Sequence, residues 1–554
     1  MAEQKLILDY VFDHERDDPD RVYLVQPYDG GKTVEYTWGQ VVDQARRMAA
    51  HLRSAGIGEG DHVGMLSKNC AHFFIAELAI WMAGGTTVAI FPTEGPDTVR
   101  YVLEHSDAKL LFVGKLDDWP RQAPGVPEGM PRIALPLAPD TPYDRWDDIV
   151  ARTQPIQGRV QRRADELAMI IYTSGSTGTP KGAMHAFGGV SAAAEGIVTS
   201  ERFTPQDRLI SYLPLAHVFE RAFIESASFV SGSKVFFAET LDSFVQDVRR
   251  ARPTLFISVP RLWVKFQHGV QHKMPQKKLD LLLKIPILNN IVRRKILDGL
   301  GLDQVRLAGS GSAPIPPEII AWYHRLGLNL MEGYAMTEDF AYSHVSRENA
   351  HAPGYVGIPY PGVQVKISDD GEVLIKSPGQ MVGYYKQPEL TAESFTQDGF
   401  FRTGDLGERN AQGLLKLTGR AKELFKTAKG KYVAPAPIEN LLGESPLIEM
   451  SMVSGVGQPA AYALVTLSEE IRPSLGEPGV RERVERELAE LLQRVNSQVA
   501  DYEQLKMLVV SGNPPTVENG LLTPTMKVKR AKVEAAVADR MERWYAAKGP
   551  VVWD

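Results

Sequence analysis

The segment "IYTSGSTGTPKG", residues 171–182, combines three glycines, six hydroxyl-bearing side chains and one lysine directly behind an apolar run. Glycines let the backbone approach an anion closely, hydroxyl groups donate hydrogen bonds, and the lysine adds positive charge. The segment departs from the P-loop pattern G-x-x-x-x-G-K-[ST], because Pro180 stands five residues after Gly175 and Gly182 replaces the hydroxyl that should follow the lysine. Taken alone, it is either another kind of nucleotide loop or a surface turn with an incidental lysine.

Two further polar, glycine-rich segments also follow runs that predict strands. "GSGSAP" at 309–314 comes after "VRLA", and "EGYAMTE" at 332–338 comes after "LNLM". In an open parallel sheet, ligands bind in the crevice at the carboxyl ends of the strands. We therefore expect the three segments to meet at one sheet edge and to form a single nucleotide site.

The first three-quarters of the chain alternates short β-branched runs with helical patterns. This alternation predicts an α/β fold whose parallel-rich sheets are layered with helices. Strands are expected at 62–66, 109–113, 167–172, 234–238, 255–260 and 305–310. A capping box formed by Thr37 and Gln40 opens a helix that stops at Gly56.

The pattern changes from residue 422 onward, where the strands are shorter and two charged amphipathic helices are expected near 478–498 and 529–547. A chain of 554 residues is also too long for one hydrophobic core. We therefore predict a large N-terminal domain, residues 1–420, and a small α+β C-terminal domain, residues 421–554. The two are joined around "LTGRAKELFK".

Composition excludes several classes of protein. A net charge of −6 gives no general attraction to nucleic acid, and the single cysteine, Cys70, excludes an intrachain disulfide and fits a reducing compartment. The N-terminus shows no secretory signal. The most apolar stretch, 73–91, carries Glu77 and is cut by Gly84 and Gly85, so it predicts a helix followed by a buried strand instead of a membrane span. We expect a cytoplasmic protein whose oligomeric state stays open, a dimer included.

Eight segments, in this order along the chain, resemble the successive motifs of the adenylate-forming superfamily, which includes acyl-CoA synthetases, luciferases and peptide-synthetase adenylation domains. They are "YTSGSTGTPKG" (172–182), "YLPLAHVFER" (212–221), "GSAPIPPE" (311–318), "GYAMTE" (333–338), "GEVLIKSPGQMVGYY" (371–385), "FRTGDLG" (401–407), "LTGRAKELFK" (417–426) and "TPTMKVKR" (523–530). Three stretches resemble long-chain fatty acyl-CoA synthetases in particular. These are "LPLAHVFER", "VPRLWVKF" (259–266), and the pair "KGKYVAPAPIEN" with "ENGLLTPTMKVKR".

The resemblance implies a set of residues that bind ATP and Mg²⁺. They are Thr173, Ser174, Gly175, Ser176, Thr177, Gly178 and Lys181 for the β- and γ-phosphates; Tyr334 and Gly311, Ser312, Ala313 and Pro314 for the two faces of adenine; Thr337 for the α-phosphate; Gly333, Ala335 and Met336 as further nucleotide-binding members of the same motif; Asp405 and Arg420 for the ribose; and Glu338 with Thr173 for Mg²⁺. Outside its motif, Glu338 would be a solvated helix-capping carboxylate.

Lys527 matches the family's catalytic lysine. The acyl carboxylate attacks the α-phosphorus of ATP, and an ammonium placed between the two groups stabilises the charge that develops in the transition state. Because Lys529 and Arg530 are close by, a basic, solvated helix start is the alternative. Lys422 matches the hinge between two orientations of the small domain, which would bring "KTAKGKYVAP" (426–435) to the pantetheine of coenzyme A.

Two aromatic positions resemble parts of the acyl pocket. His217 would orient the acyl carboxylate, with a hydrogen-bonded core histidine as the alternative. Trp263 would gate a fatty-acid tunnel, with a buried tryptophan in an apolar cluster as the alternative. Two positions depart from the family pattern. Ala335 stands where glycine is usual, and Ser312 stands where glycine or alanine is usual. We expect altered selectivity at both positions without loss of activity.

The segment 273–298 is basic and amphipathic in an acidic protein. It predicts either a peripheral contact with anionic lipid or a solvated helical face. Taken together, the resemblance implies an ATP-dependent, AMP-forming ligase that joins a medium- to long-chain fatty acid to coenzyme A, with Lys527, Glu338, His217 and Thr173 in catalysis. A ligase for aryl acids, one that loads a carrier protein, a luciferase-like oxidoreductase and an inactive nucleotide sensor are the alternatives.

Overall fold

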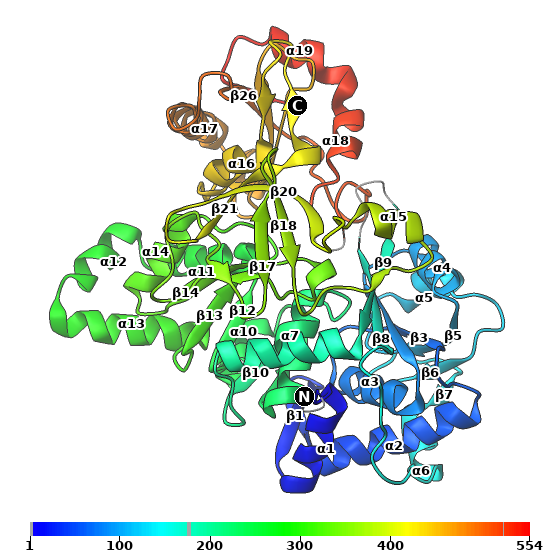
Figure 1. The fold of residues 1–554 in the computed structure, drawn as a ribbon. Helices are drawn as coiled ribbons and strands as arrows, with labels where there is room; N and C mark the ends of the chain where they lie inside the picture. The colour runs from blue at the N-terminus through cyan, green and yellow to red at the C-terminus, as the bar shows by residue number, and fades with distance from the viewer. Residues whose placement is uncertain (1–3, 174–178, 524–525) are drawn as a thin grey trace.

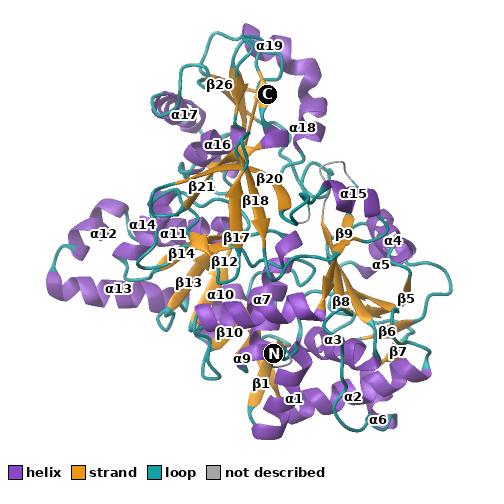
Figure 2. Ribbon diagram, in the orientation of Figure 1, coloured by secondary structure: helices purple, strands orange, loops and turns teal. Residues whose placement is uncertain are grey.

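The chain folds into a broad N-terminal part and a smaller C-terminal part that sits over it (Figure 1). The computed structural model describes residues 4–173, 179–523 and 526–554. Helices and strands alternate through the N-terminal part, where helices cover the sheets (Figure 2). The predicted α/β class, with a smaller α+β region at the C-terminus, is confirmed.

Three sheets build most of the N-terminal part, and they contain all the strands predicted there. The first has the order β19 (Gly383–Tyr384), β9 (Lys181–Ala186), β8 (Leu167–Thr173), β4 (Thr86–Ile90), β3 (His62–Leu66), β5 (Ala108–Val113), β6 (Arg132–Ala134), β7 (Asp144–Arg145). The second has the order β12 (Leu255–Ser258), β13 (Leu307–Ser310), β14 (Leu330–Tyr334), β15 (His344–Val345), β16 (Ile358–Pro359). The third has the order β10 (Arg208–Ser211), β11 (Lys234–Phe237), β1 (Val22–Tyr28), β2 (Lys32–Thr37).

The apolar stretch 73–91 is a core helix followed by a core strand, as predicted. Every residue of α3 (Ala71–Ala83) and of β4 is buried. Gly84 ends the helix at a φ of 108°, and a Cβ at that position would lie 3.1 Å from the backbone nitrogen of Glu59, so the turn requires glycine. None of the helices in the described part of the chain has the length and hydropathy needed to span a lipid bilayer.

The expectation that three glycine-rich segments share one sheet edge is wrong. The strand before residues 174–182 is β8 of the eight-stranded sheet, whereas β13 and β14 are parallel neighbours in the five-stranded sheet. Strand periodicity predicts which runs are strands but not which sheet each joins, since pairing depends on contacts far apart in the sequence. The two sheets nevertheless direct these strand ends into a common cavity.

The C-terminal part follows a four-stranded antiparallel sheet formed by β17 (Gln364–Ile367), β18 (Glu372–Lys376), β20 (Phe401–Arg409) and β21 (Leu415–Arg420). Its own sheet contains β24 (Ile448–Ser454), β25 (Ala461–Leu467), β26 (Leu505–Val510) and β27 (Val551–Trp553), packed with α16 (Pro435–Gly443) and α17 (Val480–Asn496). The helix predicted at 529–547 is instead two helices, α18 (Arg530–Val537) and α19 (Met541–Ala546), separated by a 3₁₀ turn. The turn redirects the chain so that Trp544 packs beside Tyr462.

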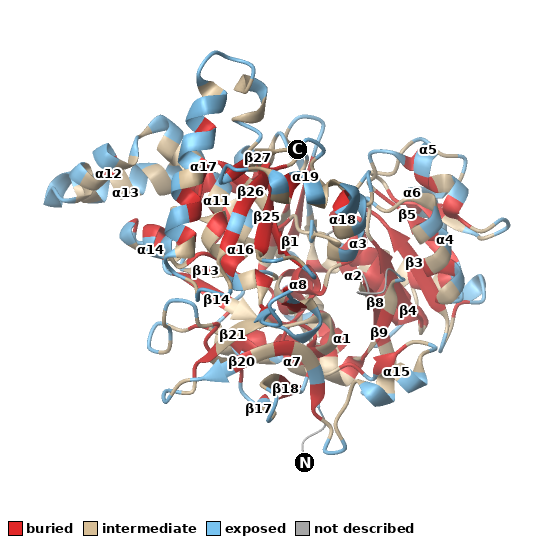
Figure 3. Cartoon of the chain, turned by 90° about the horizontal axis from the view of Figure 1, so that it is seen from above, coloured by how far each residue is buried: buried red, intermediate tan, exposed pale blue. Residues whose placement is uncertain are grey.

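The segment 273–298 forms a helical hairpin that projects from the N-terminal part (Figure 1). It contains α12 (Gln276–Leu283) and most of α13 (Pro286–Leu300), and no residue of α13 is buried (Figure 3). Five aliphatic side chains here are exposed: Leu281, Ile285, Ile287, Leu288 and Ile291. Seven basic and two acidic side chains accompany them.

Candidate active site

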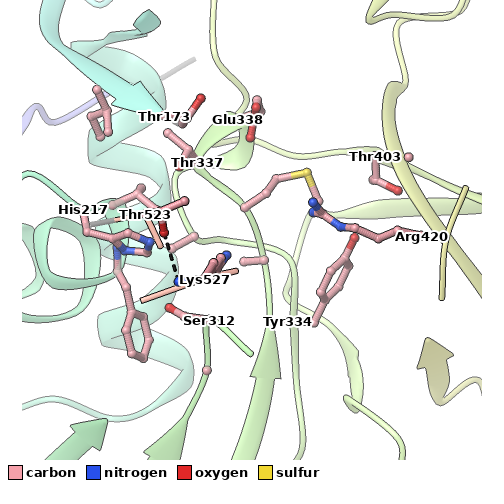
Figure 4. Close-up of a pocket in the computed structure, with 18 of the residues that line it drawn as sticks. Thr173, His217, Ser312, Tyr334, Thr337, Glu338, Thr403, Arg420, Thr523 and Lys527 are labelled. Atoms are coloured by element: carbon pink, nitrogen blue, oxygen red, sulfur yellow. Dashed lines mark hydrogen bonds between the residues drawn. The ribbon is translucent and has the colours of Figure 1, made fainter. Parts of the chain in front are cut away.

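A cavity of about 1200 Å³ lies where the two parts of the chain meet (Figure 4). Most of the predicted site residues line it, and they come from segments far apart in the sequence. They are Thr173, Lys181, His217, Gly311, Ser312, Gly333, Tyr334, Ala335, Met336, Thr337, Glu338, Arg420, Lys422 and Lys527. The cavity is therefore lined by strand ends from two sheets, by the 3₁₀ turn at the end of β21 and by the loop before α18.

Some predicted site residues do not line this cavity or lie outside the described residues. Ala313 and Pro314 are exposed and do not line the cavity. Trp263, expected as an acyl gate, is fully buried in α11 (Pro260–Lys273) and donates its indole N–H to the Gly309 carbonyl at 3.2 Å. It packs behind the cavity wall, so the structure favours the buried-cluster alternative. The predicted phosphate-binding residues 174–178 lie outside the described residues.

Lys527 reaches the cavity from a short loop of the C-terminal part. Its backbone N–H donates to Oγ1 of Thr523 at 3.0 Å, and its carbonyl accepts from the Thr523 N–H at 2.8 Å (Figure 4). Solvent in the cavity reaches the side chain, although protein surrounds it on most sides. Burial, followed by the Arg420 guanidinium, lowers the pKa of Lys527. The Asp405, Glu423 and Glu338 carboxylates act in the opposite direction, so the ammonium stands among charges of both signs.

His217 faces Lys527 across the cavity (Figure 4). It is the N-cap of α8 (Val218–Glu220), and its Nδ1 accepts a hydrogen bond from the Phe219 backbone N–H at 3.2 Å. Burial, with a smaller contribution from Lys527, lowers the pKa of His217 to about 3, so the ring is neutral at pH 7. Because Nδ1 is an acceptor, the proton of the neutral ring lies on Nε2. His217 therefore offers a hydrogen-bond donor to a carboxylate.

The side chains of Tyr334, Asp405 and Arg420 form a connected group at one side of the cavity. The Tyr334 hydroxyl donates to one carboxylate oxygen of Asp405 at 2.6 Å, and Nε of Arg420 donates to the other at 2.6 Å. Asp405 and Arg420 are direct cross-strand partners on β20 and β21. Asp405 itself is buried and does not line the cavity, so its predicted contact with ribose remains a prediction.

Glu338 has a partner that the sequence reasoning did not single out. The Tyr384 hydroxyl donates to Oε1 of Glu338 at 2.7 Å, and Nζ of Lys181 lies 5.6 Å from the centre of the Tyr384 ring. Burial and the Glu338 carboxylate raise the pKa of Tyr384, which keeps the hydroxyl protonated and donating. Tyr384 belongs to the motif at 371–385 quoted above. Its position in "GYY" is the feature of the sequence that could have indicated a role in the site.

The oxygen ligands present suit a hard divalent cation. Oε2 of Glu338 and the Thr173 hydroxyl are the types of donor that Mg²⁺ binds. Among the residues that the structure describes, no three acidic, histidine or cysteine side chains cluster as a metal site. One or two protein oxygens fit Mg²⁺ that is held mainly by nucleotide phosphates and water.

Ser312 and Ala335 both lie in the cavity wall. Ser312 adopts a φ of 68°, a left-handed conformation that glycine would adopt with less strain. Ser312 and Lys527 both line this cavity (Figure 4). The altered selectivity expected at these two positions remains a prediction.

Two family models match the chain. The model for the AMP-binding enzyme matches residues 11–385, and the model for the AMP-binding enzyme C-terminal domain matches residues 423–549. A relative in Mycobacterium tuberculosis, the long-chain-fatty-acid–CoA ligase FadD15, is 32% identical over 97% of this chain and 96% of its own length. The peroxisomal long chain acyl-CoA synthetase 7 of Arabidopsis thaliana is 29% identical over 93% of this chain and 83% of its own.

A solved structure shows the same fold. The A-PCP didomain of carboxylic acid reductase from Segniliparus rugosus, in complex with AMP, matches with a TM-score of 0.81 and 24% identity. The match covers 98% of this chain and 83% of that one.

Proposed function

The chain belongs to the AMP-binding enzyme family, and from this premise we propose that it is an ATP-dependent, AMP-forming acyl-CoA synthetase for medium- to long-chain fatty acids. In the first half-reaction, a carboxylate oxygen attacks the α-phosphorus of ATP, and the bond to the bridging oxygen breaks to release pyrophosphate. In the second, the thiol of coenzyme A attacks the acyl carbon and loses its proton, and AMP leaves with the electron pair of the acyl–oxygen bond.

The observation that carries the proposal is the meeting of Lys527 and His217 in one cavity. Nε2–H of His217 can hold an acyl carboxylate from the N-terminal side, while the Lys527 ammonium approaches from the C-terminal side. As the carboxylate attacks, negative charge develops on the carboxylate and α-phosphate oxygens. An ammonium between them stabilises this charge more in the transition state than in the ground state. Lys527 thus favours the first half-reaction.

Nucleotide binding is assigned to the strand ends around this pair. Tyr334 would stack on adenine, with its hydroxyl fixed by Asp405, and Thr337 would contact the α-phosphate. Glu338 and Thr173 would hold Mg²⁺, which neutralises phosphate charge when it is bound. Tyr384 keeps the Glu338 carboxylate in place.

Coenzyme A binding is assigned to a second orientation of the C-terminal part. We place the domain boundary after residue 420 and the hinge at Lys422, an exposed residue in the 3₁₀ turn η4 (Ala421–Glu423). Phe425, Lys426 and Tyr432 already line the cavity. A rotation at the hinge would withdraw Lys527 and bring residues 426–435 to the pantetheine.

Contact with lipid is assigned to the hairpin of residues 273–298. Its five exposed aliphatic side chains sit among an excess of basic groups, which is the composition of a helix that lies on an anionic surface. A fatty acid partitions into such a surface, so this contact would place the enzyme beside its substrate.

The test is pyrophosphate release from ATP with a panel of acids, each measured with and without coenzyme A. We expect release with fatty acids and formation of acyl-CoA only when coenzyme A is present. Turnover limited to aryl acids would show that the substrates are aryl acids and not fatty acids. Adenylate formation with no transfer to coenzyme A would favour a ligase that loads a carrier protein, the arrangement of the reductase didomain named above.

A further inference from the structure

The cavity has an apolar arm that runs along β13 away from the nucleotide side. Gly311, just past the carboxyl end of β13, and Leu307, at its start, both line the cavity. The side walls of the arm are mostly apolar and include Phe219, Phe223, Ile257, Met331 and Val345, while Ser310 and His344 also line the cavity. This arm is the space available for the hydrocarbon part of an acyl group.

The length of β13 sets the depth of the arm. Gly311 comes four positions after Leu307, and a strand rises about 3.3 Å per residue, so the arm extends about 13 Å. An alkyl chain built from bonds of about 1.5 Å at about 111° advances about 1.25 Å per carbon, so about ten carbons fill this length.

The far end of the arm is polar, unlike its walls. Glu201 and Tyr360 line the cavity, and the Glu201 carbonyl accepts from the Arg306 side chain at 3.2 Å, which places Glu201 beside the start of β13. The Tyr360 ring is held by stacking on Tyr342 at 4.6 Å, and the Arg347 guanidinium lies 6.0 Å from its centre.

These polar groups are only partly satisfied by the protein. The Glu201 carboxyl lies beside the Tyr360 hydroxyl. Burial raises the pKa of both groups; the Glu201 carboxylate raises the pKa of Tyr360 further, whereas the Tyr360 hydroxyl and the Arg347 guanidinium act to lower the pKa of Glu201. Yet Oε1 of Glu201, the hydroxyl oxygen of Tyr360, and Nε and Nη2 of Arg347 are buried and complete no hydrogen bond of ordinary geometry with other described residues. Buried groups of this kind are normally paired, so the end of the arm suits a ligand that supplies hydrogen bonds.

We propose that the preferred acid is a straight chain of about ten carbons that carries a hydroxyl group at or next to its far end. The proposal rests on the function proposed above and narrows its substrate class. A hydroxyl group can donate to Glu201 and accept from Tyr360 at the same time, whereas a terminal methyl group can do neither. A methyl group there supplies no hydrogen bond to either protein group, so Oε1 of Glu201 and the Tyr360 hydroxyl stay without one of ordinary geometry.

The test compares decanoic acid with 10-hydroxydecanoic acid in acyl-CoA formation by the full chain. We expect kcat/KM to be roughly ten- to a hundredfold higher for the hydroxy acid, which is the range expected when a buried polar group gains a partner. Tyr360→Phe removes the hydroxyl and keeps the stacked ring, and it should reduce this ratio about tenfold. The ratio is taken within one preparation, so a loss of folded enzyme cancels.

Tyr342→Phe is the matched control. Its hydroxyl donates to the Pro361 carbonyl at 3.0 Å and does not line the cavity, so the ratio should not change. Equal or better use of decanoic acid by the wild-type enzyme, or an unchanged ratio in Tyr360→Phe, overturns the inference. If no acid in the series gives acyl-CoA, the proposed function fails instead.

Discussion

Replacing Lys527 with alanine removes the ammonium group that faces His217 across the cavity. A unit charge about 4 Å from a developing negative charge contributes about 4 kcal/mol at an effective dielectric constant of about 20. Loss of one preorganised stabilising group in an enzyme raises the barrier by about 3–4 kcal/mol, which is a similar value. Adenylate formation by Lys527→Ala should therefore slow by two to three orders of magnitude.

The second half-reaction should survive the same substitution. It forms a bond at the acyl carbon, and the proposed rotation at Lys422 would carry Lys527 away from the reacting atoms. The assay supplies synthetic acyl-adenylate and coenzyme A, and it follows acyl-CoA directly. Parallel reactions with ATP and the free acid follow pyrophosphate.

Lys548→Ala is the control, because Lys548 is an exposed lysine of the C-terminal part that does not line the cavity. It should leave both half-reactions unchanged. If Lys527→Ala slows both half-reactions equally, Lys527 does not act in the first half-reaction alone, and this part of the proposal is wrong. If it slows neither, the lysine is the solvated helix start that the sequence also allowed.

Three further predictions concern pH, stability and lipid. Since burial and a neighbouring cation lower the pKa of Lys527, its ammonium is lost below the usual pH of about 10.5, and adenylation should fall on the alkaline side earlier than for a free lysine. Arg221→Met should lower the free energy of unfolding by about 3–5 kcal/mol in urea denaturation, because it leaves the buried Glu77 carboxylate without its partner at 2.6 Å. Ile287→Asp should reduce sedimentation with anionic vesicles severalfold, whereas Leu241→Asp, at an exposed position outside the hairpin, should not.

The outcomes that contradict these three predictions are distinct. A rate of adenylation that stays level up to pH 10.5 would mean that Lys527 is not needed as a cation. For stability, Arg163→Met is the control, since Arg163 is an exposed arginine that pairs with Glu59 at 3.1 Å and with Glu166 at 2.8 Å. Ion pairs of an exposed side chain contribute little, so the urea midpoint should fall far less than for Arg221→Met. Equal midpoints for Arg221→Met and Arg163→Met would contradict the argument. Vesicle binding that is the same for Ile287→Asp and the wild type would assign the hairpin to solvent.

Local patterns predicted elements that the structure contains: every strand expected in the N-terminal part is present. The Thr37 capping box opens α2 (Trp38–Ser54) as expected, with the Gln40 N–H donating to Oγ1 of Thr37 at 3.3 Å, because such a box needs only residues three positions apart. The order of the motifs also predicted that residues of the N-terminal and C-terminal parts, Lys527 included, belong to one site, and they line one cavity. These successes depend on short-range chemistry or on whole motifs, which a single sequence displays directly.

The sequence did not predict which distant side chains pair with each other or which of them line the cavity. Tyr384 and Glu338 are 46 residues apart, and only β19, at the edge of the eight-stranded sheet, brings the hydroxyl to the carboxylate. Glu201 and Tyr360 meet because one follows α7 (Phe187–Ser200) and the other follows β16, and no periodicity relates those two positions. The polar end of the acyl arm is therefore a property of tertiary packing. A motif could identify where the phosphate and the carboxylate are held, but not what the far end of the substrate must carry.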